Sequence, residues 1–366
     1  MRPTKAVINL SNLRENYLNI RKHSIPARVI PVIKADGYGH GAIEVANALL
    51  KTDFPPELFA VAMAEEAVIL RNSGIKTPIL VFENLSYNNL TEHLDYSLIP
   101  TVADAEGIQV FGELTDEQRR ILSPAIKVDT GMGRIGLTPK ETPDALRLLS
   151  SNGIQSIHSV YTHLATSDEE DLTYAEAQSA KYFSLIKELK NMGLPFGSAH
   201  FSNSGGIHNL EQRGADFVRA GISLYGYYPS EFCRTKIPLK PVMSLVSEVA
   251  TIRYFKTGES VSYGRKFIVS APTQIASIPV GYADGIPRCL SGKISVLIGG
   301  KRYAQIGTIT MDRIMVDCGN DPIDQHDEVS LFGEEGVTAD TWARLANTIS
   351  YEITCGISKR VPREYI

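Results

Sequence analysis

The segment Val32-Ile-Lys-Ala-Asp-Gly-Tyr-Gly-His-Gly41 joins a predicted strand to a predicted helix. Residues 28–33, which end just before Lys34, are mostly apolar and β-branched, as is typical of a buried strand. Three glycines within five residues predict a turn, and residues 42–50 resume as a helix. Together these parts form one β/α unit. In a β/α barrel, the strand end that carries Lys34 is where catalytic residues lie.

Lys34 is a candidate for covalent chemistry. Burial disfavours the ammonium form of a lysine, and a neutral amine can form a Schiff base with an aldehyde cofactor. The alternative is a lysine at a strand end whose charged head simply reaches solvent. Residues elsewhere in the chain decide which of these two interpretations holds.

The β/α pattern recurs along the first 230 residues and predicts a (β/α)8 TIM-type barrel. The expected barrel strands are 28–33, 58–61, 78–82, 97–101, 123–128, 157–161, 197–201 and 217–224. The expected helices are 11–22, 42–50, 64–73, 87–95, 104–114, 140–150 and 171–192, with a helical turn at 205–210. A further short strand at 5–10 precedes the barrel and can join the domain that follows it.

Residues 231–366 have a different pattern, which predicts an all-β domain. Pro238 and Pro241 mark the change. Short β-branched runs separated by turn residues are expected to be strands, at 242–254, 274–279, 294–298, 302–306, 313–317 and 328–332. One helix, at 338–349, is expected to close this domain.

Bulk composition narrows the class of protein. The chain has 366 residues, 43% of them hydrophobic, and a net charge of -4, which is ordinary for a globular enzyme and predicts no nucleic-acid partner. Its four cysteines form no C-x-x-C pair, and its N-terminus lacks a signal-peptide pattern, so a cytoplasmic location is expected. No apolar run approaches the ~20 residues of a membrane span. We expect no bound metal, since no HExxH motif is present.

Polar residues follow the predicted strands and are expected to meet on the C-terminal rim of the barrel. They are Lys34, Tyr38, Lys127, Asp129, Arg134, His163, Asn203, Ser204, Arg219, Gly221 and Ile222. Lysines and arginines outnumber carboxylates in this set, so the rim is suited to an anionic ligand, and a phosphate is the obvious one. Glycine amides and the Ser204 hydroxyl can donate to phosphate oxygens.

Each of these residues also has a structural interpretation. His163 can be an ordinary core histidine, and Asn203 and Ser204 can simply cap a helix. Lys127 and Asp129 can form a surface ion pair. Such residues recur at successive strand ends. This recurrence favours the functional interpretation of the whole set over a separate structural interpretation of each residue.

Motifs along the whole chain resemble those of the alanine racemase family. The barrel half contains Lys34-Ala-Asp-Gly-Tyr-Gly-His40, Lys127-Val-Asp-Thr-Gly-Met-Gly-Arg134, Asn203-Ser204 and Arg219-Ala-Gly-Ile222. The second half contains Val261-Ser-Tyr-Gly264, Gly281-Tyr-Ala-Asp-Gly285, Met311-Asp312 and Arg360-Val-Pro-Arg363. The resemblance implies a barrel followed by a β domain, pyridoxal 5′-phosphate (PLP) as cofactor, and a head-to-tail homodimer. It also implies the supply of D-alanine for peptidoglycan.

The resemblance also implies roles for single residues. Lys34 holds the cofactor and serves as one catalytic base, and Tyr263 of the partner subunit serves as the other. The implied cofactor contacts are Tyr38, His163, Asn203, Ser204, Arg219, Gly221, Ile222 and Tyr351. Arg219 faces the pyridine nitrogen, and His163 bridges it to the catalytic tyrosine. The implied substrate contacts are Arg134, Met311, Asp312 and, at the entrance, Tyr282. Lys127 matches a lysine that is often carbamylated.

One departure from the family pattern is Thr310, which stands where other members often have serine or cysteine. Two other enzymes remain alternatives on this framework. One is a barrel-type amino acid decarboxylase, whose phosphate and substrate motifs differ from Asn203-Ser204 and Met311-Asp312. The other is a racemase with broader specificity or with a preference for serine or lysine, because a pocket discriminates only modestly over one methylene or hydroxyl. A non-enzymatic cofactor-binding barrel would lack the second domain.

Overall fold

The computed structural model describes residues 3–154 and 156–366. These residues divide into two compact units. The barrel unit comprises residues 13–37 and 42–240, and the β unit comprises the described part of 1–12 together with 38–41 and 241–366. The units therefore divide after Lys240, whereas the sequence pattern predicted a boundary after residue 230. The short segment 38–41 is part of the β unit.

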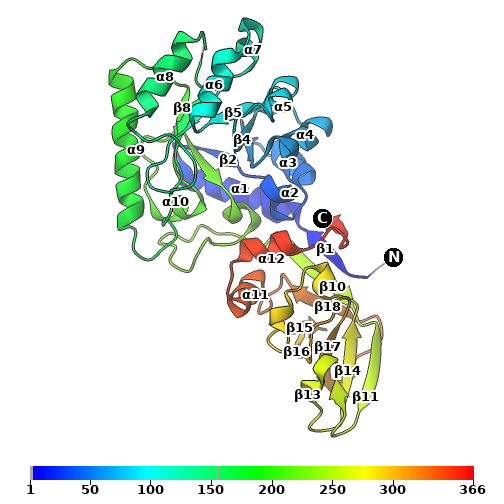
Figure 1. The fold of residues 1–366 in the computed structure, drawn as a ribbon. Helices are drawn as coiled ribbons and strands as arrows, with labels where there is room; N and C mark the ends of the chain where they lie inside the picture. Colours follow the sequence, from blue (N-terminus) through cyan, green and yellow to red (C-terminus); the bar gives the residue numbers. More distant parts are fainter. Residues whose placement is uncertain (1–2, 155) are drawn as a thin grey trace. The chain divides into compact units, whose positions relative to one another are not determined.

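The barrel unit is built on an eight-stranded parallel sheet with the order β2-β9-β8-β7-β6-β5-β4-β3 (Figure 1). A parallel bridge between Val32 and Ala60, and a hydrogen bond of 2.9 Å from the Ile33 amide to the Ala60 carbonyl, bring the two ends of the sheet together. The strands are β2 (Arg28–Pro31), β3 (Phe59–Val61), β4 (Ile79–Asn84), β5 (Ile99–Val102), β6 (Ala125–Lys127), β7 (Ser159–Tyr161), β8 (Ser198–His200) and β9 (Phe217–Ala220). The predicted barrel is confirmed.

Helices follow the strands of this sheet in alternation. They are α1 (Leu10–Ser24), α2 (Lys34–Tyr38), α3 (Ala42–Leu50), α4 (Ala64–Asn72), α5 (Leu90–Asp95), α6 (Ala105–Glu113), α7 (Asp116–Ile121), α8 (Thr142–Ser151), α9 (Thr173–Asn191) and α10 (Ser204–Asn209), with a 3-10 turn, η1 (Ile222–Tyr225). Among the α-helices, α2 lies in the segment that was expected to be a turn, and α7, a single polar turn begun by the capping residue Thr115, has no counterpart among the expected helices.

The interior of the barrel is polar at mid-height. Thr101, Lys127, Tyr161, His200 and Arg219 come from five strands and are each at most 3% exposed. Their side chains contact one another: Thr101 Oγ1 lies 2.8 Å from Tyr161 OH, the Tyr161 ring stacks on His200, and both cations lie over the Tyr161 ring. An apolar shell, which includes Phe111, Leu146 and Tyr182, packs outside the strands. The strands thus hold a buried polar cluster inside an apolar wall.

The β unit contains a nine-stranded sheet with the order β11-β14-β17-β16-β15-β18-β10-β1-β19. The strand expected at 5–10 is β1, which pairs antiparallel with β10 and parallel with β19. The strands are β1 (Lys5–Ile8), β10 (Met243–Glu248), β11 (Thr251–Phe255), β14 (Thr273–Ile278), β15 (Ser295–Ile298), β16 (Lys301–Ile306), β17 (Ile314–Gly319), β18 (Glu328–Phe332) and β19 (Arg363–Tyr365). A separate hairpin pairs β12 (Ser260–Val261) with β13 (Phe267–Ile268).

The β unit differs from the expected pattern in three respects. The run 242–254 is two strands, β10 and β11, which pair with different neighbours. The expected helix is α11 (Ala339–Ala346), and a second helix, α12 (Ser350–Gly356), follows it, so the unit is mostly β rather than purely β. Short 3-10 turns lie at η2 (Tyr263–Arg265), η3 (Tyr282–Asp284) and η4 (Arg288–Leu290).

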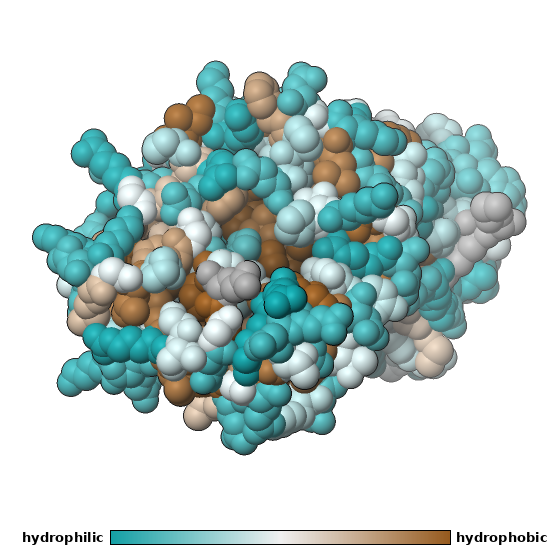
Figure 2. Space-filling model, turned by 90° about the horizontal axis from the view of Figure 1, so that it is seen from above, coloured by the Kyte–Doolittle hydropathy of each residue, from teal (hydrophilic) through white to brown (hydrophobic). Residues whose placement is uncertain are grey.

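Hydrophilic residues cover most of the face seen in Figure 2, with hydrophobic residues gathered near the middle of the view. Within residues 3–154 and 156–366, no helix combines the length and apolar character that crossing a membrane requires.

Candidate functional site

Lys34 follows β2 and begins a left-handed turn. Ala35, Asp36 and Gly37 have φ values of 51°, 53° and 62°. Left-handed backbone costs an L-residue roughly 1–2 kcal/mol, so the surrounding contacts must hold the turn. The Gly37 amide donates to Ile33 O at 2.9 Å, and Asp36 Oδ1 accepts from the Ala42 amide at 2.9 Å. The backbone after Lys34 is therefore fixed in a strained shape, as is common at functional sites.

Glu66, on the first turn of α4, holds the other side of this turn. Its carboxylate accepts from the Ala35 amide at 2.6 Å and from the Ala62 and Met63 amides at 2.7 and 3.3 Å. The peptide that follows Lys34 is thus tied to a neighbouring β/α unit by a charge-assisted hydrogen bond. No sequence pattern reveals this role, because the contact joins residues 31 positions apart.

Replacing Glu66 by glutamine should destabilise the protein by about 1–3 kcal/mol, since one amide oxygen cannot serve all three backbone donors. Urea unfolding should show a lower midpoint with an unchanged slope. Glu65→Gln is the matched control, because Glu65 is the exposed neighbour on the same turn. Equal midpoints for the two variants would contradict the anchoring role of Glu66.

Lys127 ends β6 inside the barrel. It is 3% exposed, and its Nζ lies 5.0 Å from the centre of the Tyr161 ring. Burial, followed by the nearby cations Arg219 and Arg134, holds the pKa of Lys127 well below its usual value. Burial therefore favours the neutral amine over the ammonium form. The surface ion pair with Asp129 considered from the sequence is wrong, because this lysine is buried.

Asp129 shapes the loop that carries Arg134. Its carboxylate accepts from the amides of Gly131 and Met132, each at 2.8 Å, and from the amide of Gly133 at 2.9 Å. Three converging amides neutralise this carboxylate where it stands. Asp129 therefore organises the loop, and its charge favours the ammonium form of Lys127 less than burial and the two arginines disfavour it.

Arg219, on β9, is the hub of the barrel interior. It is 2% exposed and donates to His200 Nδ1 at 2.8 Å, to the carbonyls of Thr162 and Phe201 at 2.7 and 2.9 Å, and to His163 Nδ1 at 3.3 Å. Burial lowers the pKa of Arg219 to about 10, so the guanidinium stays charged at neutral pH. The contact between Arg219 and His163 is the one that the family resemblance implied.

His163 shows how many cations converge at this rim. Burial is the main reason that its pKa lies well below the usual value, and Arg219, Lys127, Arg134 and Lys34 lower it further, in that order. Apart from burial, the groups that set this pKa are all cations. The strand ends therefore form a strongly electropositive site that favours an anionic ligand.

Ser204 and the segment that begins at Gly221 lie together at the ends of β8 and β9. Ser204 Oγ accepts from the Gly221 amide at 3.0 Å and from the Ser223 amide at 3.4 Å. Asn203 acts as a helix cap, as the structural interpretation expected: its Oδ1 accepts from the Gly206 amide at 3.0 Å. Ile222 is fully buried beside Gly221.

His208, on the same short helix, makes the barrel unit sensitive to acid. Its Nδ1 donates to the Thr235 carbonyl at 2.7 Å, and Ser223 Oγ lies 3.0 Å from its Nε2. Burial lowers the pKa of His208 from 6.5 to about 4, so between these values the unfolded chain binds a proton that the folded chain does not. The contribution of His208 to the free energy of unfolding is complete above pH 6.5. As the pH falls towards 4, about 3 kcal/mol of this contribution is lost.

Urea unfolding at pH 7 and at pH 4.5 measures this loss. His208→Gln should lose less free energy of unfolding on acidification than the parent protein. His326→Gln is the control, because the side chain of His326 is 74% exposed, and it should behave like the parent. The same acid-induced loss in the parent and in His208→Gln would show that His208 has no such effect.

In the β unit, Tyr38 and Tyr351 lie with their ring centres 5.9 Å apart. Gly39, with a φ of 84°, follows Tyr38, and a Cβ at this position would overlap the carbonyl of Thr354 on α12. Glycine therefore allows the segment of Tyr38 to approach α12 closely.

Tyr263, Tyr282 and Met311 lie on connected loops of the β unit and are 72%, 41% and 51% exposed. Thr308 Oγ1 donates to the Tyr263 carbonyl at 3.1 Å, and the Tyr282 amide donates to the Thr310 carbonyl at 3.0 Å. Large apolar side chains gathered on linked loops are typical of a surface that binds a partner or ligand.

Thr310 and Asp312 are fixed within these loops. The Thr310 hydroxyl donates to the Arg313 carbonyl at 2.9 Å and accepts from the Arg313 amide at 3.0 Å, so it closes the turn that presents Met311. Asp312 pairs with Arg360 at 2.6 Å, and Arg360 also pairs with the buried Asp284 at 2.8 Å. Asp284 and Arg360 lie in motifs that carry the family resemblance, but their pairing could not be predicted from the sequence.

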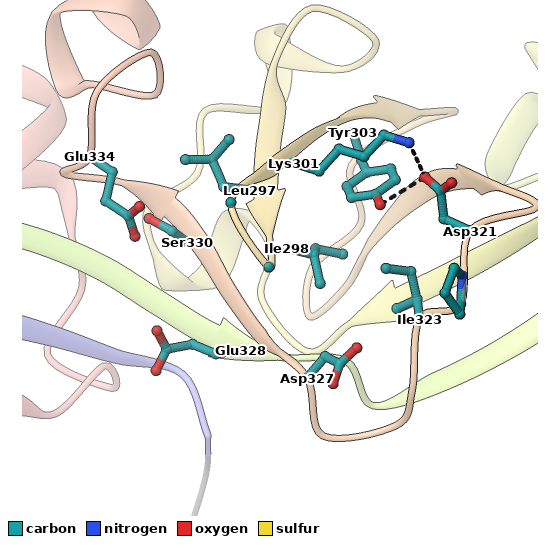
Figure 3. Close-up of a pocket in the computed structure, with 13 residues that line it drawn as sticks. Leu297, Ile298, Lys301, Tyr303, Asp321, Ile323, Asp327, Glu328, Ser330 and Glu334 are labelled. Carbon is teal, nitrogen blue, oxygen red and sulfur yellow. Dashed lines mark hydrogen bonds and ion pairs between the residues drawn. The ribbon is translucent and has the colours of Figure 1, made fainter.

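The β unit also has a cavity of about 590 Å³, shown in Figure 3. Lys301 and Tyr303 both bond to Asp321 along one side of it, and Asp327, Glu328 and Glu334 are among its other lining residues. It is lined by none of the residues that the sequence singled out. In the described residues, no group of three or more histidine, cysteine, aspartate or glutamate side chains is placed to hold a metal ion.

A β/α barrel with lysines and arginines at its strand ends, joined in sequence to a mostly-β unit, is the architecture of a barrel enzyme. Two family models match the chain: the N-terminal domain of alanine racemase over residues 8–229 and the C-terminal domain over residues 242–365. The chain belongs to the alanine racemase family.

Full-length relatives agree with this assignment. An alanine racemase of Desulforamulus reducens is 38% identical over 100% of this chain and 99% of its own length. Alanine racemase 1 of Clostridium acetobutylicum is 40% identical over 100% of this chain and 96% of its own length. The solved alanine racemase of Clostridium difficile 630 superposes with a TM-score of 0.92 at 35% identity, covering 100% of this chain and 96% of that one. The protein is therefore an isomerase that acts on alanine.

Proposed function

We propose that this protein interconverts L- and D-alanine with PLP held by Lys34, in a homodimer whose active sites each contain Tyr263 of the partner subunit. The observation that carries the proposal is the convergence of the basic side chains Arg219, Arg134 and Lys34 on His163. Such a site favours a phosphorylated cofactor and an amino acid carboxylate over a neutral ligand. The product, D-alanine, is a building block that we propose is used for peptidoglycan.

The residues of the barrel unit fit PLP. Ser204, Gly221 and Ile222 offer a hydroxyl and backbone amides for a phosphate, and we assign Tyr38, Tyr351 and Asn203 to the same end of the cofactor. Arg219 is a permanent donor, suited to an aromatic nitrogen that accepts a hydrogen bond. When bound, PLP acidifies the Cα proton of an amino acid.

Two bases on opposite faces are needed to exchange that proton with inversion. We assign the proton on the D side to the amine of Lys34 and the proton on the L side to the phenol of Tyr263. A phenolate acts as a base where cations stabilise it. Arg219 contacts His163 at 3.3 Å, and we assign to His163 the link between this cation and Tyr263 of the partner subunit. Tyr263 is 72% exposed on its own chain, so it is available to a second copy.

Substrate carboxylate contacts are assigned to Arg134 and to the backbone of Met311, with Asp312 beside them and Tyr282 at the entrance. Lys127 is assigned a carbamate, because burial lowers the pKa of its amine and so favours the nucleophilic neutral form, and because Arg134 and Arg219 lie near it. The amine attacks CO2 and releases one proton, which leaves an anion that can orient Arg134.

Reduction with borohydride after incubation with PLP tests the assignment of the cofactor lysine. Peptide mapping should find the pyridoxyl mass on the peptide that contains Lys34. Lys34→Ala protein is the control and should carry no label. Label on the Lys127 peptide in the parent protein would contradict the assignment.

A further inference from the structure

A chain of hydrogen bonds continues from Arg219 through the barrel, away from the strand ends. Arg219 donates to His200 Nδ1 at 2.8 Å, His200 Nε2 lies 3.2 Å from Ser159 Oγ, and Ser159 Oγ lies 3.2 Å from His158 Nδ1. Arg219, His200 and Ser159 are at most 2% exposed. His158, just before β7, lines a cavity of about 650 Å³ at the start of the strands. The chain of hydrogen bonds thus runs from mid-height in the barrel to the start of the strands.

Arg219 determines which groups donate and which accept along this chain of hydrogen bonds. A guanidinium has donors and no acceptor, so His200 Nδ1 must accept. The neutral ring then carries its proton on Nε2 and donates it to Ser159 Oγ. The Ser159 hydroxyl can in turn donate to His158 Nδ1 when that nitrogen carries no proton. Burial and the charge of Arg219 hold the pKa of His200 well below its usual value, which keeps the ring neutral.

The His200 ring is held in place, so its main remaining variable is which ring nitrogen carries the proton. It stacks on Tyr161 at 4.9 Å with an interplanar angle of 11°. If the proton moved to Nδ1, it would point at the N–H group of Arg219, and the bond of 2.8 Å would become a repulsive contact. Two contacts therefore favour the Nε2–H form of His200: the donor of Arg219 at Nδ1 and the acceptor of Ser159 at Nε2.

We propose that Ser159 is a positioning residue for the active site: its hydroxyl holds His200 in the Nε2–H form, and His200 thereby fixes the orientation of Arg219. The inference rests on the proposed function for its effect on catalysis. The hydrogen-bond arrangement itself does not depend on catalysis.

Ser198 offers a matched control. It faces Ser159 in the register of β7 and β8 and is 5% exposed, and its hydroxyl donates to the His158 carbonyl at 3.4 Å. Ser198→Ala removes a hydroxyl of the same size and depth without touching the bond to His200. Ser159→Cys complements Ser159→Ala, because it preserves the side-chain size and is only a weak acceptor.

The test is nitrogen-15 NMR of histidine-labelled protein, with the His200 signals assigned through His200→Gln. The parent and Ser198→Ala should show the Nε2–H form of His200. Ser159→Ala and Ser159→Cys should show a smaller proportion of that form, because only Arg219 then favours it. Turnover should fall by about tenfold or more in both Ser159 variants, with a smaller change in KM for alanine.

An unchanged Nε2–H form of His200 in both Ser159 variants would overturn the inference, as would turnover equal to that of Ser198→Ala. Suppose instead that the His200 form shifts as expected but the parent does not racemise alanine. The proposed function then fails, while the hydrogen-bonding role of Ser159 stands.

Discussion

Mixing Lys34→Ala protein with Tyr263→Phe protein is expected to restore about a quarter of the parent activity, although each variant alone is inactive. Random exchange makes half of the dimers mixed, and in a two-fold dimer one of their two sites is then intact. That site combines Lys34 of one variant with Tyr263 of the other. Alanine racemisation, followed by a D-amino acid oxidase assay during subunit exchange, measures the recovery.

The control is a mixture of Lys34→Ala with the double variant Lys34→Ala/Tyr263→Phe. This mixture contains no intact Lys34, so it should stay inactive. Differently tagged chains show that exchange has taken place. If exchange is complete and Lys34→Ala with Tyr263→Phe stays inactive, then Tyr263 does not act across the dimer.

Replacing Arg219 by leucine is expected to lower kcat/KM for alanine by about 10²–10³, as loss of a preorganised donor does in other enzymes. It should also raise the pKa values of His163 and His200. The charge of Arg219 is the largest cause, after burial, that lowers both values, and removing a nearby cation favours the protonated ring. NMR titration of the two histidines measures this change.

Arg147→Leu is the control for this experiment, because Arg147 forms an exposed ion pair with Asp144 on the barrel surface. It should leave both activity and the two histidine titrations unchanged. Histidine pKa values in Arg219→Leu that match those of the parent would show that Arg219 does not control the electrostatics of the rim.

The barrel could be predicted from sequence because its strands are short, buried and bounded by polar turns. The expected strand 28–33 corresponds to β2, and the expected strand 197–201 contains β8. The pairs that the sequence missed are short, such as β12 with β13, two residues each. The run 242–254 looked like one strand because periodicity does not reveal that its halves bond to different neighbours.

The candidate site was predicted less completely than the fold. Strand ends located Lys127 and Arg219, but a sequence pattern carries no information on which side chains meet across the barrel. His200 was missed for this reason, although it lies on a predicted strand and only a few residues before Asn203 and Ser204, which were predicted to be site residues. The left-handed turn after Lys34 was missed because Ala35 and Asp36 ordinarily avoid that backbone region.

Incubation of the purified protein with L-alanine in D2O tests the central claim most directly, when chirality and deuterium at Cα are followed together. The account predicts D-alanine that carries deuterium at Cα, because each face of the substrate has its own base. Deuterium exchange without D-alanine would contradict the two-base assignment and remove Tyr263 from it. Absence of both, from protein with PLP bound at Lys34, would contradict the proposed reaction itself.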